Sequence, residues 1–332
     1  MARIQDVAAA AGVSKATVSY VFSPQKSHLI SPETRERVLA AAGKLGYKPS
    51  FLGKVLSYKR SFNAALILPS RSSQTMSRTL LQVFHGIMHN AETSEYNVSV
   101  FFGVGKRFFK YSSEGRFDGI IVIGLGSDTA ALDKLAALGL PMVVANRQYP
   151  ASEKVSCIYN DIAGWFNQEV DRMLQNGCKK ILLLNKGMHA DAGKVVADVF
   201  DEAAVRVKKH GSAIEQAAIG EKFSIQVNEL LKNKHYDSII INSSEGAEVV
   251  NVLKLHKLLP NRDIQLSGFV RDPELRSLGL DWDVEATVMG NRAWYMLMEL
   301  LAGGNGKCEV LPVVRKTAHR IKKVGYSEGF DI

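Results

Sequence analysis

The sequence has few cysteines and no long apolar run. Its three cysteines, Cys157, Cys178 and Cys308, are widely spaced, odd in number and lack a Cys-x-x-Cys pair, which argues against a disulfide framework and against a zinc ribbon. The apolar runs are strand-sized and fall short of the roughly 18–20 residues that a membrane helix needs. Asp6 interrupts any secretory signal at the N-terminus. We therefore expect a cytoplasmic protein with no membrane partner.

Motifs of enzyme active sites are also missing. There is no Gly-x-Ser-x-Gly turn and no phosphate-binding loop with its lysine, and Gly103-x-Gly105 lacks the third glycine of a dinucleotide site. His85 and His89 have the helical spacing of a metal-binding pair, but they lack the Glu of His-Glu-x-x-His and an evident third ligand. Two ordinary histidines are the simpler interpretation. The sequence thus indicates no enzyme, no cofactor and no metal site.

Positive charge is concentrated at the N-terminus. The chain has 332 residues, enough for two or three domains, with 46% apolar and 23% charged residues as in ordinary globular proteins. Residues 1–60 contain ten Lys and Arg against three acidic residues, so they carry +7 of the net +9. A basic module on a near-neutral body suggests a polyanionic partner. The alternative is that these basic residues only form a solvent-exposed surface, which would give the same composition.

Residues 4–47 have the pattern of three short helices. The first, 6–11, ends at Gly12, and Ser14 is a good N-cap for the second, 15–22. Because so few residues separate these two helices, they are expected to form a sharp helix-turn-helix corner.

The third helix begins at Ser31, with Pro32 in its first turn, and ends at Gly46. Pro49 then opens a linker with little apolar content of its own. Four of its apolar residues still have helical spacing: Phe51, Leu52, Val55 and Leu56. A helix this short is expected to fold only with help from a partner.

From residue 61 onward, strand patterns alternate with helix patterns. Strands are expected at Asn63–Leu68, Asn97–Phe102, Gly119–Ile123, Met142–Asn146, Lys180–Asn185, Ser238–Asn242 and Ile264–Phe269. Helices are expected at Met76–Ser94, Asp128–Leu138, Ile162–Asn176, Asp191–Lys209, Ile225–Asn233, Glu245–Leu255 and Thr287–Ala302. This α/β alternation is typical of parallel sheets with helices on both faces. The elements are too many for one sheet, so two similar lobes are expected, with ligands at the carboxyl ends of the strands.

Several motifs of the first sixty residues occur together in a fixed order. They are Asp6-Val7-Ala8, Ala11-Gly12-Val13-Ser14, Thr17-Val18-Ser19, Ser31 to Val38, and Leu45-Gly46-Tyr47-x-Pro49. In this order and spacing they resemble the LacI family of bacterial transcription regulators. The rest of the chain is similar, less closely, to the periplasmic-binding-protein-like effector domain of that family. The matching segments include Gly86-Ile87, Phe117-Asp118-Gly119-Ile120-Ile121 and Gly290-x-x-Ala293.

The resemblance implies three parts. Residues 1–48 would form an all-α helix-turn-helix DNA-binding domain, and residues 49–60 a hinge helix or linker. Residues 61–332 would form a two-lobed α/β domain, periplasmic-binding-protein-like, for effector binding and dimerisation.

The resemblance also implies which residues contact double-stranded DNA. Lys15, Ala16 and Tyr20 match the base-reading positions of the second helix, which lies in the major groove in this family. Lys can reach guanine acceptors and Ala can contact the thymine methyl, whereas Tyr20 stands where Arg is common and cannot grip guanine bidentately. Phosphate contact or helix capping is expected for three further residues, Ser14, Thr17 and Ser19.

The linker resembles the hinge helix of the family. Ser50, Gly53 and Lys54 stand where its consensus has Asn, Ala and Arg, and Gly53 makes the helix about 1 kcal/mol harder to form than Ala would. Leu56 matches the leucine that wedges into a central base step from the minor groove. Lys54 and Leu56 are therefore candidate DNA-binding residues. The alternative is that Leu56 only packs against its own domain.

The effector site is where the sequence departs from the family. Positions that hold one Arg and two Asp as sugar anchors in the family hold Val196, Ser244 and Val270 in this chain. Asn146 precedes Arg147 where an Asp is common. The loss of three anchors predicts weak binding of neutral sugars, because each buried hydroxyl left without its partner costs ~1–3 kcal/mol.

Other residues of the effector site are kept or shifted. Phe223 keeps an aromatic position that can stack on a ligand, and the Asp-Asn pair of the family is reversed, with Asp161 second. A slip of one or two residues would bring in Lys194, Glu245 or Asp272. The resemblance therefore leaves two effector types open, beside the alternative that neighbouring side chains have taken over ordinary sugar binding. One is an anion held by Arg147 with Lys194 or Arg271, and the other is a less polar molecule on Phe223 between Val196 and Val270.

Taken together, the residues and the resemblance predict a homodimeric repressor. It would bind a pseudo-palindromic operator, and a small-molecule effector between the lobes would change its DNA affinity. A solute-binding protein of the transport type would share residues 61–332 but would need an export signal. An enzyme on this fold would need a nucleophile-base pair. A sensor controlled by a protein partner, or one without small-molecule control, is a further alternative.

Overall fold

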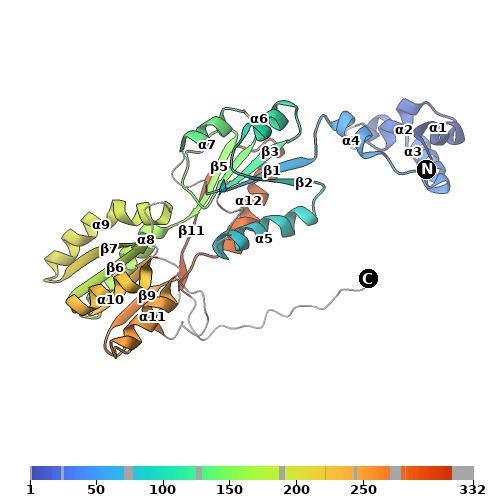
Figure 1. The fold of residues 1–332 in the computed structure, drawn as a ribbon. Coiled ribbons are helices and arrows are strands. Elements are labelled where there is room, and N and C mark those ends of the chain that lie inside the picture. Colours follow the sequence, from blue (N-terminus) through green and yellow to red (C-terminus); the bar gives the residue numbers. More distant parts are fainter. Residues whose placement is uncertain are drawn as a thin grey trace. The chain divides into compact units, whose positions relative to one another are not determined.

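The computed structural model describes residues 2–23, 26–70, 78–124, 129–186, 191–220, 222–242, 245–269, 278–280 and 282–315, without the side chains of 186 and 191–194. The chain divides into two units. The small unit comprises residues 1–62 together with 115–118, and the large unit comprises the rest (Figure 1).

The small unit is built from short helices around one apolar core. Its elements are α1 (Ile4–Ala11), α2 (Lys15–Val21), the 3-10 turn η1 (Ser27–Leu29), α3 (Pro32–Leu45) and α4 (Phe51–Tyr58). Val7, Val18 and Val38, one from each of the first three helices, are fully buried in this core. Gly12 and Gly46 end α1 and α3 with φ of 65° and 60°, a backbone conformation that suits glycine. The three short helices expected here are therefore present.

The large unit contains two lobes, each formed by a parallel sheet between helices. The sheet of the first lobe has the strand order β11-β5-β4-β3-β1-β2. Its strands are β1 (Asn63–Leu68), β2 (Asn97–Phe102), β3 (Gly119–Ile123), β4 (Met142–Ala145), β5 (Val155–Asn160) and β11 (Cys308–Leu311). Its helices are α5 (Arg78–Glu92), α6 (Lys106–Ser113), α7 (Thr129–Ala136) and α12 (Ala286–Leu301). The chain leaves this lobe after β5 and returns to it with α12 and β11.

The sheet of the second lobe has the strand order β7-β6-β8-β9. Its strands are β6 (Lys180–Lys186), β7 (Ala213–Ile219), β8 (Ser238–Asn242) and β9 (Gln265–Gly268). Helices α8 (Ile162–Gln175) and α9 (Asp191–Lys209) pack on one face, and α10 (Phe223–Asn233) and α11 (Gly246–Leu255) on the other. A small antiparallel pair, β10 (Trp282–Asp283) and β12 (Val314–Arg315), completes the described strands.

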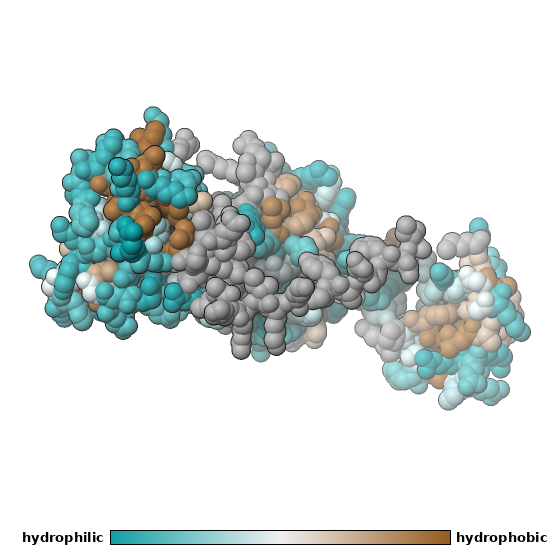
Figure 2. All heavy atoms as spheres, turned by 90° about the horizontal axis from the view of Figure 1, so that it is seen from below, coloured by the Kyte–Doolittle hydropathy of each residue, from teal (hydrophilic) through white to brown (hydrophobic). Residues whose placement is uncertain are grey.

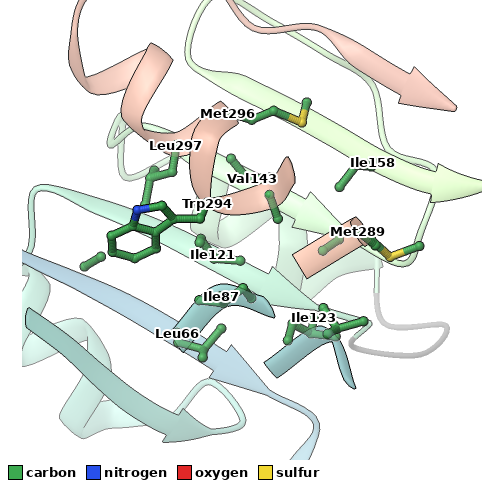
Figure 3. Packing of buried hydrophobic residues seen from close by; sticks show 14 of the residues in the cluster. Leu66, Ile87, Ile121, Ile123, Val143, Ile158, Met289, Trp294, Met296 and Leu297 are labelled. Atoms are coloured by element: carbon green, nitrogen blue, oxygen red, sulfur yellow. The ribbon is translucent and has the colours of Figure 1, made fainter. Parts of the chain in front are cut away.

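The core of the first lobe lies between its sheet and the helices α5 and α12. Figure 3 shows Leu66, Ile121 and Val143 of the strands facing Ile87 of α5 and Trp294 of α12. Since side chains alternate along a strand, the other residues of the same strands face the side where α6 and α7 lie (Figure 1). Burial on both faces explains why these strands appear in the sequence as continuous apolar runs.

Helices α5 and α12 cross so closely that glycine is required at the contact. A Cβ atom on Gly290 would run into the backbone oxygen of Val83, and one on Gly86 would run into the backbone oxygen of Thr287. Both glycines belong to motifs that the sequence analysis singled out, and the structure gives them this physical role.

The structure contains a disulfide, although the number and spacing of the cysteines argued against a disulfide framework. Cys157 of β5 and Cys308 of β11 stand opposite each other in neighbouring parallel strands and form a disulfide, with a Cα–Cα distance of 4.6 Å. The two residues are 151 positions apart, so spacing gave no sign of the pair. Cys178 is buried and outside this bond.

Candidate functional site

Helix α2 presents a polar face beside the buried core of the small unit. Lys15, Ala16 and Ser19 are exposed, whereas Val18 and Val21 of the same helix are buried. This division follows the helical repeat, since residues three and four apart share a face. Three of the sequence-predicted contacts therefore lie on the accessible side of α2, whereas Thr17 and Tyr20 are half-buried.

The start of α2 is fixed by its own side chains. Ser14 Oγ accepts a hydrogen bond from the backbone N–H of Thr17 at 3.0 Å, and the two hydroxyl oxygens are 2.9 Å apart. Ser14 is thus an N-cap, one of the two roles considered for it. Tyr20 is half-buried, and the ammonium of Lys26 lies 4.8 Å from the centre of its ring. Lys26 adds positive charge beside this face, and the sequence analysis had not included it.

Helix α4 has one half-buried face and one exposed face. Lys54 is half-buried, and Leu56 has 80% of its surface exposed. Leu52, one turn before Leu56, is 73% exposed. Ser50 Oγ accepts a hydrogen bond from the N–H of Gly53 at 3.1 Å and caps the helix. The exposure of Leu56 argues against a packing role within its own unit.

Two of the predicted effector residues follow β4 in the first lobe. Asn146 is exposed, with φ of 62°, and Arg147 is half-buried. The guanidinium of Arg147 donates from Nη2 to Thr129 Oγ1 at 2.8 Å. Nearby, burial and a hydrogen bond to Asp133 raise the pKa of Tyr149 to about 12, so this phenol stays protonated at neutral pH. Arg147 thus provides positive charge at the carboxyl end of a buried strand.

Two other predicted effector residues lie in the cores of the second lobe. Val196 of α9 has no exposed surface and packs among the apolar residues between α8, α9 and the sheet. Phe223, the first residue of α10, is 3% exposed and belongs to the core on the opposite face. The structure places both side chains in apolar packing, where little surface is left for a ligand.

Five predicted effector residues remain. One caps a helix, one has only its backbone described, and three lie outside the described residues. Asp161 Oδ1 accepts the N–H of Gly164 at 2.8 Å and caps α8. Lys194 lies in the first turn of α9, and its side chain is outside the described part of the chain. Three predicted residues lie outside the described residues altogether: Ser244, Val270 and Arg271.

Sequence analysis missed polar and aromatic residues at the carboxyl ends of strands in the second lobe. Asn242 donates to Asn185 at 3.0 Å, and each side chain is only 5% exposed. The ring of Trp165 lies 4.5 Å from that of Phe269, which directly follows β9. Each Asn is the polar end of an apolar run, a signal that could have singled them out because ligands bind at this end of such sheets.

The residues that the structure describes contain neither a metal-ion site nor a membrane-spanning helix. None of their groups of three or more His, Cys, Asp or Glu side chains is arranged to hold a metal ion. No helix among the described residues is long and apolar enough to cross a membrane.

Comparison with known sequences finds one matching family and several distant relatives. "Bacterial regulatory proteins, lacI family" matches residues 3–50. The chain is 22% identical over 277 residues to the HTH-type transcriptional regulator RegA of Clostridium saccharobutylicum, covering 80% of this chain and 81% of that protein. It is 28% identical over 163 residues to the HTH-type transcriptional repressor PurR of Photobacterium profundum, covering 47% of each. The match to PurR thus spans about half of that protein.

Solved structures show the same fold over most of the chain. A transcriptional regulator CelR–cellobiose complex matches with a TM-score of 0.63 and 21% identity, over 96% of this chain and all of that one. The lac repressor dimer bound to operator and the anti-inducer ONPF matches with a TM-score of 0.68 and 20% identity. This match covers 95% of this chain and 98% of the lac repressor chain. Residues 3–50 thus match the lacI family of bacterial regulatory proteins, and the rest of the chain has the two-lobed α/β fold of the CelR and lac repressor structures. The matched sequence relatives are transcriptional regulators or repressors and not enzymes.

Proposed function

We propose that the chain is a repressor that binds a pseudo-palindromic DNA operator as a homodimer. In this proposal residues 1–48 read the operator, residues 49–60 form the hinge, and residues 61–332 bind an effector and dimerise. The observation that carries the proposal is the exposed face of α2, where Lys15, Ala16 and Ser19 stand beside a capped N-terminus in a unit of net positive charge. A helix presented in this way fits the major groove with its N-terminal residues against base edges.

A charge-matched pair of variants tests DNA reading. Lys15→Ala removes a predicted base contact, and Lys134→Ala removes the same charge from the exposed side of α7 in the large unit. Binding is measured by fluorescence anisotropy with promoter DNA taken from beside the gene that encodes this chain. Lys15→Ala should lose ~1–3 kcal/mol of binding free energy and should change the base preference at one position of the site. Lys134→Ala should leave binding within about 0.5 kcal/mol. Equal losses for both variants would mean that Lys15 acts only through net charge.

Exposed apolar side chains on the first lobe support the homodimer. Leu81, Phe102 and Tyr295, from α5, β2 and α12, are each about half exposed. Large apolar side chains that are exposed in one chain are often covered in an interface between subunits. Figure 2 shows that exposed apolar atoms occur at several places on an otherwise hydrophilic surface. Sedimentation equilibrium of the full chain should give the mass of a dimer, and a monomer at micromolar concentration would contradict this part of the proposal.

The effector proposed here is an anionic small molecule bound between the lobes. Arg147 offers a positioned guanidinium, whereas Val196 and Phe223 are taken up by the cores, which weakens the case for an apolar ligand on those two side chains. Isothermal calorimetry against neutral sugars, sugar phosphates and sugar acids tests this directly. Micromolar binding of a phosphorylated or carboxylated ligand that changes operator affinity supports it. Micromolar binding of a neutral hexose with the same effect would overturn it.

A further inference from the structure

The linker between α4 and β1 makes two turns that bring an aromatic ring back onto α4. Lys59, the C-cap of α4, has φ of 52°, and Phe62 has φ of 50°. Both are in the left-handed region, which side-chain-bearing residues rarely adopt. Phe62 is nevertheless only 4% exposed. Such a backbone conformation persists only where surrounding contacts stabilise it. The contacts that Phe62 makes are therefore needed to stabilise this one.

Three side chains from one face of α4 contact the Phe62 ring. The ring centroid of Phe51 is 6.2 Å away and that of Tyr58 is 5.7 Å away, both edge-to-face, at interplanar angles of 61° and 74°. The ammonium of Lys54 lies 4.5 Å from the centre of the Phe62 ring. Residues 51, 54 and 58 are three and four positions apart, so a single ring touches three successive positions of the same helical face. Edge-to-face and cation–π geometries are both favourable.

Asp118 holds the backbone on which this ring stands. Its Oδ1 accepts hydrogen bonds from the backbone N–H of Ser61 at 2.7 Å and from the Ser61 hydroxyl at 3.0 Å. Its Oδ2 accepts the backbone N–H of Phe62 at 2.9 Å. These are charge-assisted bonds from one half-buried carboxylate, and Asp118 directly precedes β3 in the chain. The position of Phe62 is therefore tied to a segment more than fifty residues later in the sequence.

A short helix with a glycine in it needs such support. Helix α4 has eight residues, and Gly53 stands in its first half. Isolated helices shorter than about 12–15 residues are marginal in water, and glycine weakens them further. The ring of Phe62 contacts the Phe51–Lys54–Tyr58 face of α4, whereas Leu52 and Leu56 are exposed. The helix can thus be stabilised from one side while the other side stays accessible.

We propose that Phe62, held by Asp118, is a positioning residue that folds α4 within a single chain, before DNA or a second copy of α4 is present. The Leu52–Leu56 face is then presented in advance to DNA and to the partner helix. The inference rests on the proposed function in one respect, namely that α4 contacts DNA. It is an alternative to the expectation from the sequence that this segment folds only with a partner.

Hydrogen exchange of the full chain without DNA tests the proposal. The amides of residues 54–58 should exchange at least about tenfold more slowly than in an unfolded peptide. Phe62→Ala and Asp118→Ala should each remove about tenfold of that protection. Phe62→Leu keeps apolar volume but lacks a ring. Its protection of the α4 amides should be intermediate between that of these two variants and that of the native chain. The control is Leu52→Ala on the exposed face, which should leave protection of 54–58 unchanged or slightly higher. Amides of α3 and β1 should be unaffected by all four changes, as a local positioning role requires.

Two outcomes would overturn the inference: unprotected α4 amides in the native chain without DNA, or full protection in Phe62→Ala. If Phe62→Ala does not fold, Phe62→Leu and Asp118→Asn decide the matter, since both keep most of the volume at their sites. Exchange repeated with promoter DNA separates the two proposals. Protection that appears only with DNA would refute the folding role of Phe62 and leave DNA binding intact. Protection without DNA, together with no binding to any promoter fragment, would refute DNA binding and leave the role of Phe62 intact.

Discussion

At the scale of single residues, exposure separates the functional candidates from the structural ones. Leu56 is a large apolar residue with 80% of its surface exposed, whereas Val196 and Phe223 are buried. The sequence could identify all three by position, but it could not tell which would face solvent. Burial depends on how helices pack on sheets that are built from distant segments. For Ser14, the local pattern sufficed, because an N-cap is formed by neighbours in the chain.

The exposure of Leu56 leads to a prediction for DNA binding. Leu56→Ala should weaken binding to the operator by a few kcal/mol, the scale of the bending and unstacking that a wedged leucine supports. Binding to unrelated DNA should barely change, because Lys and Arg set it. Anisotropy on both DNA sequences measures the difference. Leu255→Ala, at a residue of α11 that is 77% exposed, is the matched control and should change neither. An equal loss on both DNA sequences would show that Leu56 is a folding residue.

At the scale of elements, the strands with strong apolar runs were predictable. Asn63–Leu68, Asn97–Phe102, Gly119–Ile123 and Ser238–Asn242 are strands with the expected bounds. The missed ones are β5, β7, β11 and the pair β10–β12, together with helix α6. Strand β7 is at the edge of its sheet and mostly half-buried, so its sequence lacks an apolar run. Strand β11 pairs with β5 across a long stretch of chain, and no local pattern reports a long-range partner.

The crossing of α5 and α12 makes a prediction about stability. Gly290→Ala should lower the free energy of unfolding by about 1–3 kcal/mol, because the new methyl would run into the backbone of Val83 and force the helices apart. Gly43→Ala, in the interior of α3 where a Cβ meets no atom within 4 Å, should be neutral or stabilising. Urea denaturation of the two variants gives both values. A Gly290→Ala protein as stable as the native chain would show that the helices do not approach this closely.

At the scale of the whole molecule, two separate segments of the chain build the first lobe. A disulfide joins β5 of the earlier segment to β11 of the later one. Cys157 and Cys308 close a loop of 151 residues, which includes all the strands of the second sheet. A chain-entropy estimate for a loop of this length is about 5 kcal/mol of stabilisation, an upper value since native-state strain reduces it.

This disulfide makes thermal stability sensitive to reduction. Dithiothreitol should lower the Tm of the oxidised chain by several degrees and leave that of Cys308→Ser unchanged, in calorimetric scans of both proteins. Peptide mapping without reductant should recover the linked Cys157 and Cys308 peptides. The same Tm with and without reductant in the native chain would contradict this role.

The central claim, that residues 1–60 carry the DNA affinity, is most directly tested by one salt titration. Anisotropy with promoter DNA should be measured from roughly 50 to 200 mM salt for the full chain and for residues 61–332. The full chain should bind at low salt and lose orders of magnitude in affinity over this range, because phosphate contacts release counterions. Residues 61–332 should not bind at any salt concentration. Retained operator binding by residues 61–332, or salt-independent binding by the full chain, would contradict the claim.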